Sequence, residues 1–164
     1  MPLGQYHRKR KFDRTPEPKG KAAKRAGKLE FVIQRHQASH LHYDFRLELD
    51  GVLKSWAVPK GPPKTSAEKR LAMMVEDHPY EYRKFHGTIP EGNYGAGTVE
   101  IWDSGTYEPL EGEGEAALRQ GLKNGDLKFI LHGKKLKGAY GLVHMKSVKQ
   151  KNAWLLIKKK KSIK

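Results

Sequence analysis

The sequence predicts an all-β protein, a barrel or a sandwich, with one short helix. Residues 41–49 alternate strictly between apolar and polar side chains, which is the pattern of a half-buried strand. Asp50-Gly51 follows at once and is typical of a two-residue hairpin turn. Further short strand patterns, separated by turns rich in Gly and Pro, continue along the chain, and only residues 113–122 show a convincing helical pattern.

The first strands are the most clearly defined. Phe31-Val32-Ile33 predicts a short strand. In residues 41–49 one face carries Leu41, Tyr43, Phe45, Leu47 and Leu49, and the other carries His42, Asp44, Arg46 and Glu48. The return strand, 52–58, ends at Pro59, and the hairpin register sets the small residues Ser55 and Ala57 beside Arg46 and Asp44. We therefore expect room above the polar face.

The remaining elements follow from the same patterns. Residues 60–69 predict a loop, and residues 70–78 alternate again, with Leu71, Met73 and Val75 on one side and Arg70, Glu76 and His78 on the other. The Gly-rich segment 89–97 predicts a plain hairpin connection, although its glycines also allow backbone N–H groups to approach a phosphate. Strands are expected at 98–102, 126–131, 136–145 and 153–157.

Composition indicates a basic, partly disordered arm (1–28), one β domain (29–158) and a basic tail (159–164). Lys and Arg number 33 against 18 Asp and Glu, and the formal charge of +15 favours nucleic acid as partner over a merely solubilising surface. The absence of Cys excludes disulfides, thiolate metal sites and a Cys nucleophile. No apolar run is long enough to span a membrane, and we expect a cytoplasmic, nucleoid-associated monomer.

The polar face of residues 41–49 carries metal-ligand residue types. His42 and Asp44 lie on one face about 7 Å apart and can close on one cation. His36 has the same parity and can join them, either along one continuous strand or through a bend, but His40 has this parity too, so the third ligand stays open. Two imidazoles and one carboxylate leave coordination positions open, as in catalytic sites, and suit Mn²⁺, with Zn²⁺ as an alternative.

Neighbouring polar residues fit phosphate chemistry. Arg46, one pleat beyond Asp44, can grip a phosphate that the metal binds. On strand 70–78, His78 can donate a proton or hold a phosphate oxygen, Arg70 can bind phosphate and Glu76 can orient a ligand histidine. An ordinary exposed face explains this second group equally well. For the first group, three ligand-type residues (His42, Asp44 and either His36 or His40) together with Arg46 on one face favour a chemical function over a plain polar surface.

Four motifs, in this order and spacing, resemble the 3′-phosphoesterase domain of bacterial DNA ligase D. They are H-x5-HYDFRLE (36–48), SWAVPKGP (55–62), EDHP (76–79) and IPEGxYGxG (89–97). The resemblance runs from about Tyr6 to about Ile157. It implies a closed antiparallel β barrel with a crescent-shaped polar groove. Since the family also occurs as single-domain proteins, we expect this chain to be free-standing.

The resemblance implies Mn²⁺-dependent removal of a 3′-terminal ribonucleoside, and then of the 3′-phosphate, from a primer-template end, leaving a 3′-OH. Zn²⁺ and Co²⁺ are alternative ions. By motif position the metal ligands are His36, His42 and Asp44, which decides against His40. Arg46 and His78 match the family's phosphate-binding pair. Further residues important for activity are matched by Lys60, Arg70, Glu76 and Tyr82.

The N-terminal motif of the family, close to K-R-D-F-x-x-T-x-E-P, is matched by residues 9–18, except that Lys11 replaces the Asp. Arg10 and Glu17 are therefore expected contributors, whereas the role of the Asp is lost or moved to Asp13. In the family this segment matters more for ribonucleoside removal than for phosphate removal. The substitution therefore bears first on the ribonuclease activity.

Two other functions compete with this enzyme. A catalytically silent adaptor would bind DNA ends and recruit a ligase or polymerase, without metal or turnover. A basic RNA-binding protein of ribosomal type would bind with steep salt dependence and ignore the chemistry of the 3′ end. For the enzyme we expect recessed or nicked 3′ ends as substrates, and a separate DNA ligase, polymerase or end-binding protein as partner through the arm or the tail.

Overall fold

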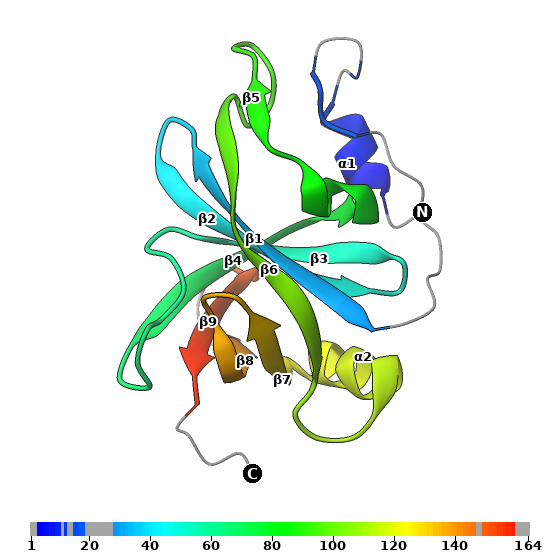
Figure 1. The fold of residues 1–164 in the computed structure, drawn as a ribbon, viewed down its shortest axis with the longest axis vertical. Helices are drawn as coiled ribbons and strands as arrows, with labels where there is room; N and C mark the ends of the chain where they lie inside the picture. Colours follow the sequence, from blue (N-terminus) through cyan, green and yellow to red (C-terminus); the bar gives the residue numbers. More distant parts are fainter. Residues whose placement is uncertain (1–2, 11, 13–14, 19–27, 147–148, 160–164) are drawn as a thin grey trace.

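A nine-stranded antiparallel sheet closes on itself as a barrel (Figure 1). Eight strands form the closed ring, and the ninth, β5, pairs only with β6. The computed structural model describes residues 3–10, 12, 15–18, 28–146 and 149–159. The strands are β1 (Leu29–Gln37), β2 (Leu41–Leu49), β3 (Val52–Val58), β4 (Lys69–Pro79), β5 (Gly87–Ile89), β6 (Gly97–Pro109), β7 (Asp126–Gly133), β8 (Lys137–His144) and β9 (Ala153–Lys158). Their order is β1-β2-β3-β4-β9-β8-β7-β6-β5, and the additional β1–β6 pairing closes the barrel. The predicted all-β barrel is confirmed.

The β2–β3 hairpin has the predicted register. Arg46 pairs with Ser55 and Asp44 pairs with Ala57. Asp50 and Gly51 both have positive φ, 55° and 82°, as a two-residue turn that follows the strand twist requires. The apolar face of β2 packs in the main core through Phe45, Leu47 and Leu49, so its polar face lies on the other side of the sheet.

Strand β6 continues to Pro109, beyond the predicted end at residue 102, because it pairs with strands that are distant in the sequence. Its second half pairs with both β1 and β7. At Gly105 the backbones approach so closely that a side chain there would collide with the His132 carbonyl oxygen. The buried Asp103 carboxylate accepts N–H bonds from Lys134, Lys135 and Leu136 at 2.9–3.2 Å and so fixes the turn between β7 and β8. Neither feature has a local signal in the sequence.

Strand β4 contains a bulge. Leu53 pairs with His78, but Ser55 pairs with Val75, so β4 has one more residue than β3 between these two pairs. Alternation is interrupted there, and the neighbours Val75 and Glu76 line the same hollow. The bulge thereby directs the polar end of β4 to the polar face of β2.

The predicted faces of residues 70–78 were wrong for this reason. Ala72 and Met74 contact the main core, whereas Leu71, which was placed on the apolar side of the strand, is 43% exposed. Alternation in the regular part of β4 puts Arg70 with Ala72 rather than with His78. A strict period of two cannot anticipate a one-residue bulge, because a single inserted residue exchanges the two faces.

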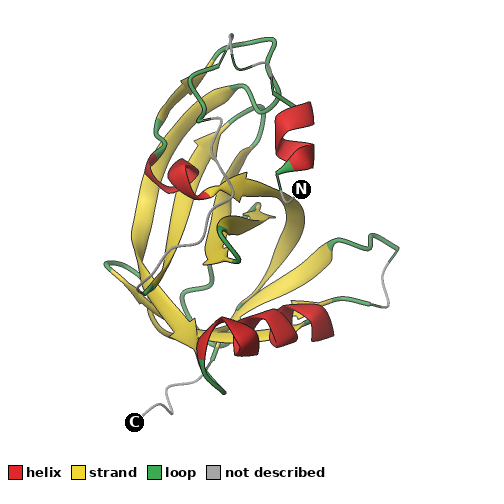
Figure 2. Ribbon diagram, turned by 90° about the vertical axis from the view of Figure 1, so that its right-hand side faces the viewer, coloured by secondary structure: helices red, strands yellow, loops and turns green. Residues whose placement is uncertain are grey.

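Helices cover two parts of the barrel. Helix α2 (Gly114–Asn124) matches the predicted helix to within two residues and lies across one end of the barrel, where Leu118 enters the core (Figure 2). It ends at Gly125, whose φ of 75° is the usual left-handed C-terminal conformation. The short helix α1 (Gly4–Arg8) and the 3-10 helix η1 (Tyr80–Lys84) had no clear sequence signal.

The described part of the N-terminal segment packs on the sheet. Tyr6 of α1 is fully buried in a second, smaller cluster with Val32, Leu53 and Tyr82. This cluster lies on the side of β1–β3 opposite the main core, since its residues alternate with core residues. Residues 19–27 of the expected arm and 160–164 of the expected tail lie outside the described residues. Among the described helices, none is long and apolar enough to cross a membrane.

Candidate active site

Three ligand-type side chains converge on the polar face of β1 and β2. His36 on β1 pairs directly with His42 on β2, and Asp44 lies one pleat further along β2. One potential ligand atom from each lies within 4.8 Å of the others. The chain turns back between β1 and β2, so the bend, not a continuous strand, brings His36 to the cluster. His40 lies in that turn and contributes its carbonyl oxygen rather than its imidazole.

The hydrogen bonds of the two imidazoles define which ring nitrogens carry protons. Nε2 of His36 lies 2.7 Å from the Gly95 carbonyl oxygen, and Nδ1 of His42 lies 3.2 Å from the His40 carbonyl oxygen. Because a carbonyl only accepts, these nitrogens donate. In the neutral imidazoles, the lone pairs of His36 Nδ1 and His42 Nε2 then face the two carboxylate oxygens of Asp44, at 3.3 and 3.2 Å.

Two lone pairs aimed at a carboxylate repel each other unless a cation or a proton lies among them. The arrangement therefore fits a divalent cation held by His36, His42 and Asp44, with each imidazole oriented by a carbonyl behind it. This set of two nitrogens and one oxygen suits a transition metal such as Mn²⁺ or Zn²⁺. A hydrogen bond to Asp44 also raises the pKa of His42, so a proton competes with a cation for this nitrogen.

Arg46 is fixed beside this cluster by contacts on all its nitrogens. Nε donates to the Gln34 side-chain oxygen at 2.7 Å, Nη1 donates to the Ser55 hydroxyl at 2.9 Å, and Nη2 lies 3.3 Å from an Asp44 oxygen. Its guanidinium also stacks over the Tyr82 ring at 4.8 Å. Burial alone would raise the pKa of Asp44, but Arg46 and the two histidines hold it well below its ordinary value. The Asp44 carboxylate therefore carries a negative charge, and the positive charge of the Arg46 guanidinium lies next to it.

His78 lines the same hollow as Arg46 and is a neutral base. Its Nδ1 donates to the Glu76 carbonyl oxygen at 3.0 Å, so its Nε2 accepts from Arg10 Nη2 at 3.3 Å. Complete burial, with the positive charges of Arg46 and Arg10 nearby, holds the pKa of His78 well below 6.5. Arg46 and His78, which were predicted as a pair, therefore line the same hollow. Arg46 donates hydrogen bonds there, whereas Nε2 of His78 accepts one.

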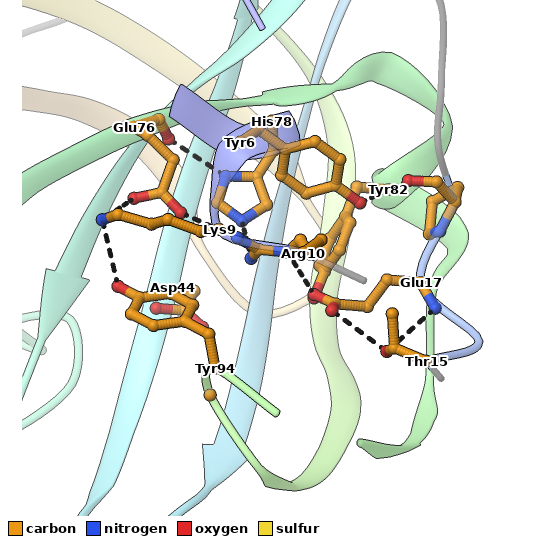
Figure 3. A network of polar contacts seen from close by, with 12 residues as sticks. Tyr6, Lys9, Arg10, Thr15, Glu17, Asp44, Glu76, His78, Tyr82 and Tyr94 are labelled. Atoms are coloured by element: carbon orange, nitrogen blue, oxygen red, sulfur yellow. Dashed lines mark hydrogen bonds and ion pairs between the residues drawn. The ribbon is translucent and has the colours of Figure 1, made fainter. Parts of the chain in front are cut away.

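The N-terminal segment supplies one wall of the site (Figure 3). Arg10 donates to a Glu17 oxygen at 3.0 Å and to a Glu76 oxygen at 3.2 Å. The Tyr82 hydroxyl donates to the same Glu17 carboxylate at 2.7 Å. Lys9 reaches Glu76 at 3.1 Å and lies 4.7 Å above the ring of Tyr94. Arg10 and Glu17 therefore line the same hollow as the ligand-type side chains, while Lys11 and Asp13 lie outside the described residues.

Glu76 does not orient a ligand histidine, as its predicted role would require. Its two carboxylate oxygens bind Lys9 and Arg10 rather than an imidazole. Burial would raise the pKa of Glu76, but a backbone hydrogen bond and these two cations lower it. Glu76 therefore holds the N-terminal segment against β4.

These residues surround one hollow of about 290 Å³. Nine of the predicted site residues line it, namely His36, His42, Asp44, Arg46, Glu76, His78, Tyr82, Arg10 and Glu17. Lys60 and Arg70 do not line it: Arg70 instead donates to the Lys60 carbonyl oxygen at 3.3 Å and pairs with Glu68 at 3.0 Å. Tyr94, which is 49% exposed at the edge of the hollow, was missed. The sequence signal that could have identified Tyr94 as a site residue was its position in the Gly-rich motif 89–97.

The Gly-rich segment is a hairpin connection, as predicted. Ile89 pairs with Gly97 across it. It presents the carbonyl oxygen of Gly95 to His36, and its Ile89 and Tyr94 also line the hollow. The segment therefore orients His36 of the candidate metal site in addition to linking two strands.

Comparison with known proteins assigns the chain to a family. Residues 34–144 match the family described as the DNA Ligase D 3'-phosphoesterase domain. The chain is 50% identical over 161 residues to the multifunctional non-homologous end joining protein LigD of Pseudomonas aeruginosa, 97% of this chain. It is 49% identical over 146 residues to the Mycolicibacterium smegmatis protein, 88% of this chain, and 46% identical over 142 residues to that of Mycobacterium tuberculosis, 86% of this chain.

The chain spans about a fifth of the length of these relatives, 19%, 19% and 18%. The matched family region runs from within β1 to the end of β8 and hence includes the three ligand-type side chains, Arg46 and His78. The identity to the Pseudomonas protein extends over nearly the whole chain. On these grounds the chain belongs to the DNA ligase D 3′-phosphoesterase domain family.

Proposed function

We propose that this protein is a Mn²⁺-dependent 3′-end-processing phosphoesterase of DNA repair. It removes a 3′-phosphate, and also a 3′-terminal ribonucleoside, from recessed or nicked primer-template ends and leaves a 3′-OH. The observation that carries the proposal is that His36, His42 and Asp44 lie in one hollow next to Arg46, whose guanidinium is held in place. A cation site beside a guanidinium is suited to a terminal phosphate.

Each side chain has a role in this proposal. A cation bound by the His36, His42 and Asp44 cluster supplies positive charge to a phosphate oxygen. Arg46 binds the same phosphate, and its contacts with Gln34 and Ser55 keep the guanidinium in place without reorganisation.

His78 acts on the other side of the phosphate. Its neutral state depends on burial near two arginines, and a phosphate dianion in the hollow favours the protonated imidazole. Protonated His78 then donates a hydrogen bond to a phosphate oxygen, or a proton to the leaving 3′ oxygen as water attacks phosphorus and the P–O bond to that oxygen breaks. Arg10, which now donates to Nε2 of His78, must turn toward the phosphate for this to occur.

Nucleic-acid ends are proposed as substrate because of the formal charge of +15 and the family membership. The relatives are named for non-homologous end joining, and we extend that setting to this chain, with action at the nucleoid and a DNA ligase, polymerase or end-binding protein as its partner. Since Lys11 replaces the family's acidic residue, we expect the phosphatase activity to exceed the ribonuclease activity.

Product analysis on primer-templates ending in a 3′-phosphate or a 3′ ribonucleotide tests the proposal, with Mn²⁺, Zn²⁺, Co²⁺ and Mg²⁺ compared. We expect a 3′-OH product with Mn²⁺, and a loss of about 10³-fold in kcat/KM for His42→Ala. His132→Ala is the matched control, because His132 is an exposed histidine that pairs with Glu108 away from the hollow. A folded His42→Ala protein as active as wild type would rule the proposal out.

The silent adaptor remains the rival function. The buried cluster of two histidines and a carboxylate has no purpose in an adaptor that binds DNA without metal. DNA-end binding without turnover under every ion of the panel would favour the adaptor over the enzyme.

A further inference from the structure

A second hollow, of about 630 Å³, lies next to the site and has no role in the proposed chemistry. It is bounded by α1, β4, the end of α2 and the loop between β8 and β9. It shares Val75 and Glu76 with the active-site hollow. The ion pair between Lys9 and Glu76 therefore lies at the boundary between the two hollows.

The charge on the second hollow is positive. Lys9, Lys123 and Lys151 line it, and Glu76, already bound by Lys9 and Arg10, is its one lining carboxylate among the described residues. Lys123 and Lys151 are exposed and make no ion pair with any residue that the structure describes. This differs from Lys54 on the barrel, which binds Asp77 at 3.0 Å. Two uncompensated ammonium groups facing one groove are suited to phosphate groups.

The backbone that carries Lys151 is held in place. The Met74 N–H donates to the Asn152 carbonyl oxygen at 2.8 Å, and the Asn152 side-chain amide donates to the Met74 carbonyl oxygen at 3.0 Å. Nε2 of His144 donates to the Lys151 carbonyl oxygen at 2.5 Å, while its ring stacks on Trp154 at 5.0 Å. Lys151 therefore projects from a turn that is pinned to β4 and β8, not from a loose loop.

We propose that the second hollow binds the phosphodiester backbone of the strand whose 3′ end lies in the active site. The nucleotides on the 5′ side of that end run over the Lys9–Glu76 pair, and Lys123 and Lys151 each contact a phosphate. This assignment rests on the proposed function for the direction of the strand. The binding itself does not require turnover, so it can be tested separately.

The test measures the binding of a labelled primer-template with a 3′-OH by fluorescence anisotropy, in EDTA and at a series of salt concentrations. The double variant Lys123→Gln, Lys151→Gln is compared with Lys134→Gln, Lys137→Gln, which removes the same charge from exposed positions that line neither hollow. We expect the slope of log K against log salt to fall by about 1.8 for the first variant, from two contacts to the duplex primer strand at roughly 0.9 each. The control should change the slope much less.

A second measurement links the groove to substrate length. The ratio of kcat/KM for a long 3′-phosphorylated strand to that for a 3′-phosphorylated mononucleotide should exceed one in the wild type and fall in the Lys123→Gln, Lys151→Gln variant. Equal slopes for the wild type and this variant, or an equal loss in the control variant, would overturn the proposal and leave the groove to another partner, such as an acidic peptide. Slope changes as expected without any turnover would support the groove while refuting the proposed enzyme.

Discussion

Two buried carboxylates in this barrel, Asp44 and Asp103, are equally removed from water, at 6% and 3% exposure, yet their surroundings differ in kind. Asp103 accepts backbone N–H groups from Ser104 and from the turn between β7 and β8. Asp44 faces only side chains, namely two imidazoles and a guanidinium. Burial therefore does not separate a structural carboxylate from a chemical one. The hydrogen-bond partners separate the two, because backbone N–H groups satisfy the oxygens of Asp103, whereas the imidazole lone pairs facing Asp44 leave its oxygens in need of a cation.

The same substitution at the two positions should separate the roles. Asp44→Asn keeps the size of the side chain but removes the charge that binds a cation, so we expect kcat/KM to fall by about 10³-fold, or about 4 kcal/mol. Isothermal titration with Mn²⁺ should show the accompanying loss of metal affinity. Unchanged Mn²⁺ affinity in a folded Asp44→Asn protein would place the cation elsewhere.

Asp103→Asn should act on stability instead. The amide group cannot accept all the N–H bonds that Asp103 accepts, and at least one buried donor loses its partner. We expect the free energy of unfolding in urea to fall by about 3 kcal/mol. Activity per folded molecule should stay close to that of wild type. A loss of activity as large as that of Asp44→Asn would end the distinction drawn between these carboxylates.

The Gly-rich segment tests how far the support of the Asp44 cluster extends. A side chain at Gly97 would collide with the Gln37 carbonyl oxygen, so Gly97→Ala must displace the start of β6 and the preceding loop, which carries Gly95 and its bond to His36. We expect a stability loss of about 2 kcal/mol and weaker Mn²⁺ binding. Gly92→Ala is the matched control, because its φ of 92° is also positive but nothing lies within 4 Å of the added carbon. Equal Mn²⁺ affinities in both variants would show that the segment does not position His36.

The pH dependence of stability should show the smallest effect. Because the pKa of His78 is lowered in the folded protein, the unfolded chain binds a proton below about pH 6.5 that the folded chain does not. This group therefore makes stability fall as the pH drops below about 6.5, by up to about 1.4 kcal/mol per pH unit. His78→Asn should remove this part of the slope in urea unfolding between about pH 7 and 5. Parallel profiles for both proteins would mean that His78 is protonated in the folded state.

The sequence alone predicted most of the candidate metal site and the arginine beside it. Strict alternation put His42, Asp44 and Arg46 on one face, and the Asp50-Gly51 turn set the register of β3. These features depend on neighbours within one hairpin, where a period of two and a known turn leave little choice. Parity left His36 and His40 as alternatives, and the family motif decided between them.

Tertiary structure decided what depends on distant contacts. The bulge in β4 brought Glu76 and His78 to the site and left Arg70 outside it. The packing of Tyr6 brought Arg10 of a segment expected to be partly disordered into contact with His78. Local patterns cannot encode these outcomes, because a bulge costs little locally, and a segment poor in apolar residues folds only where the barrel offers buried partners.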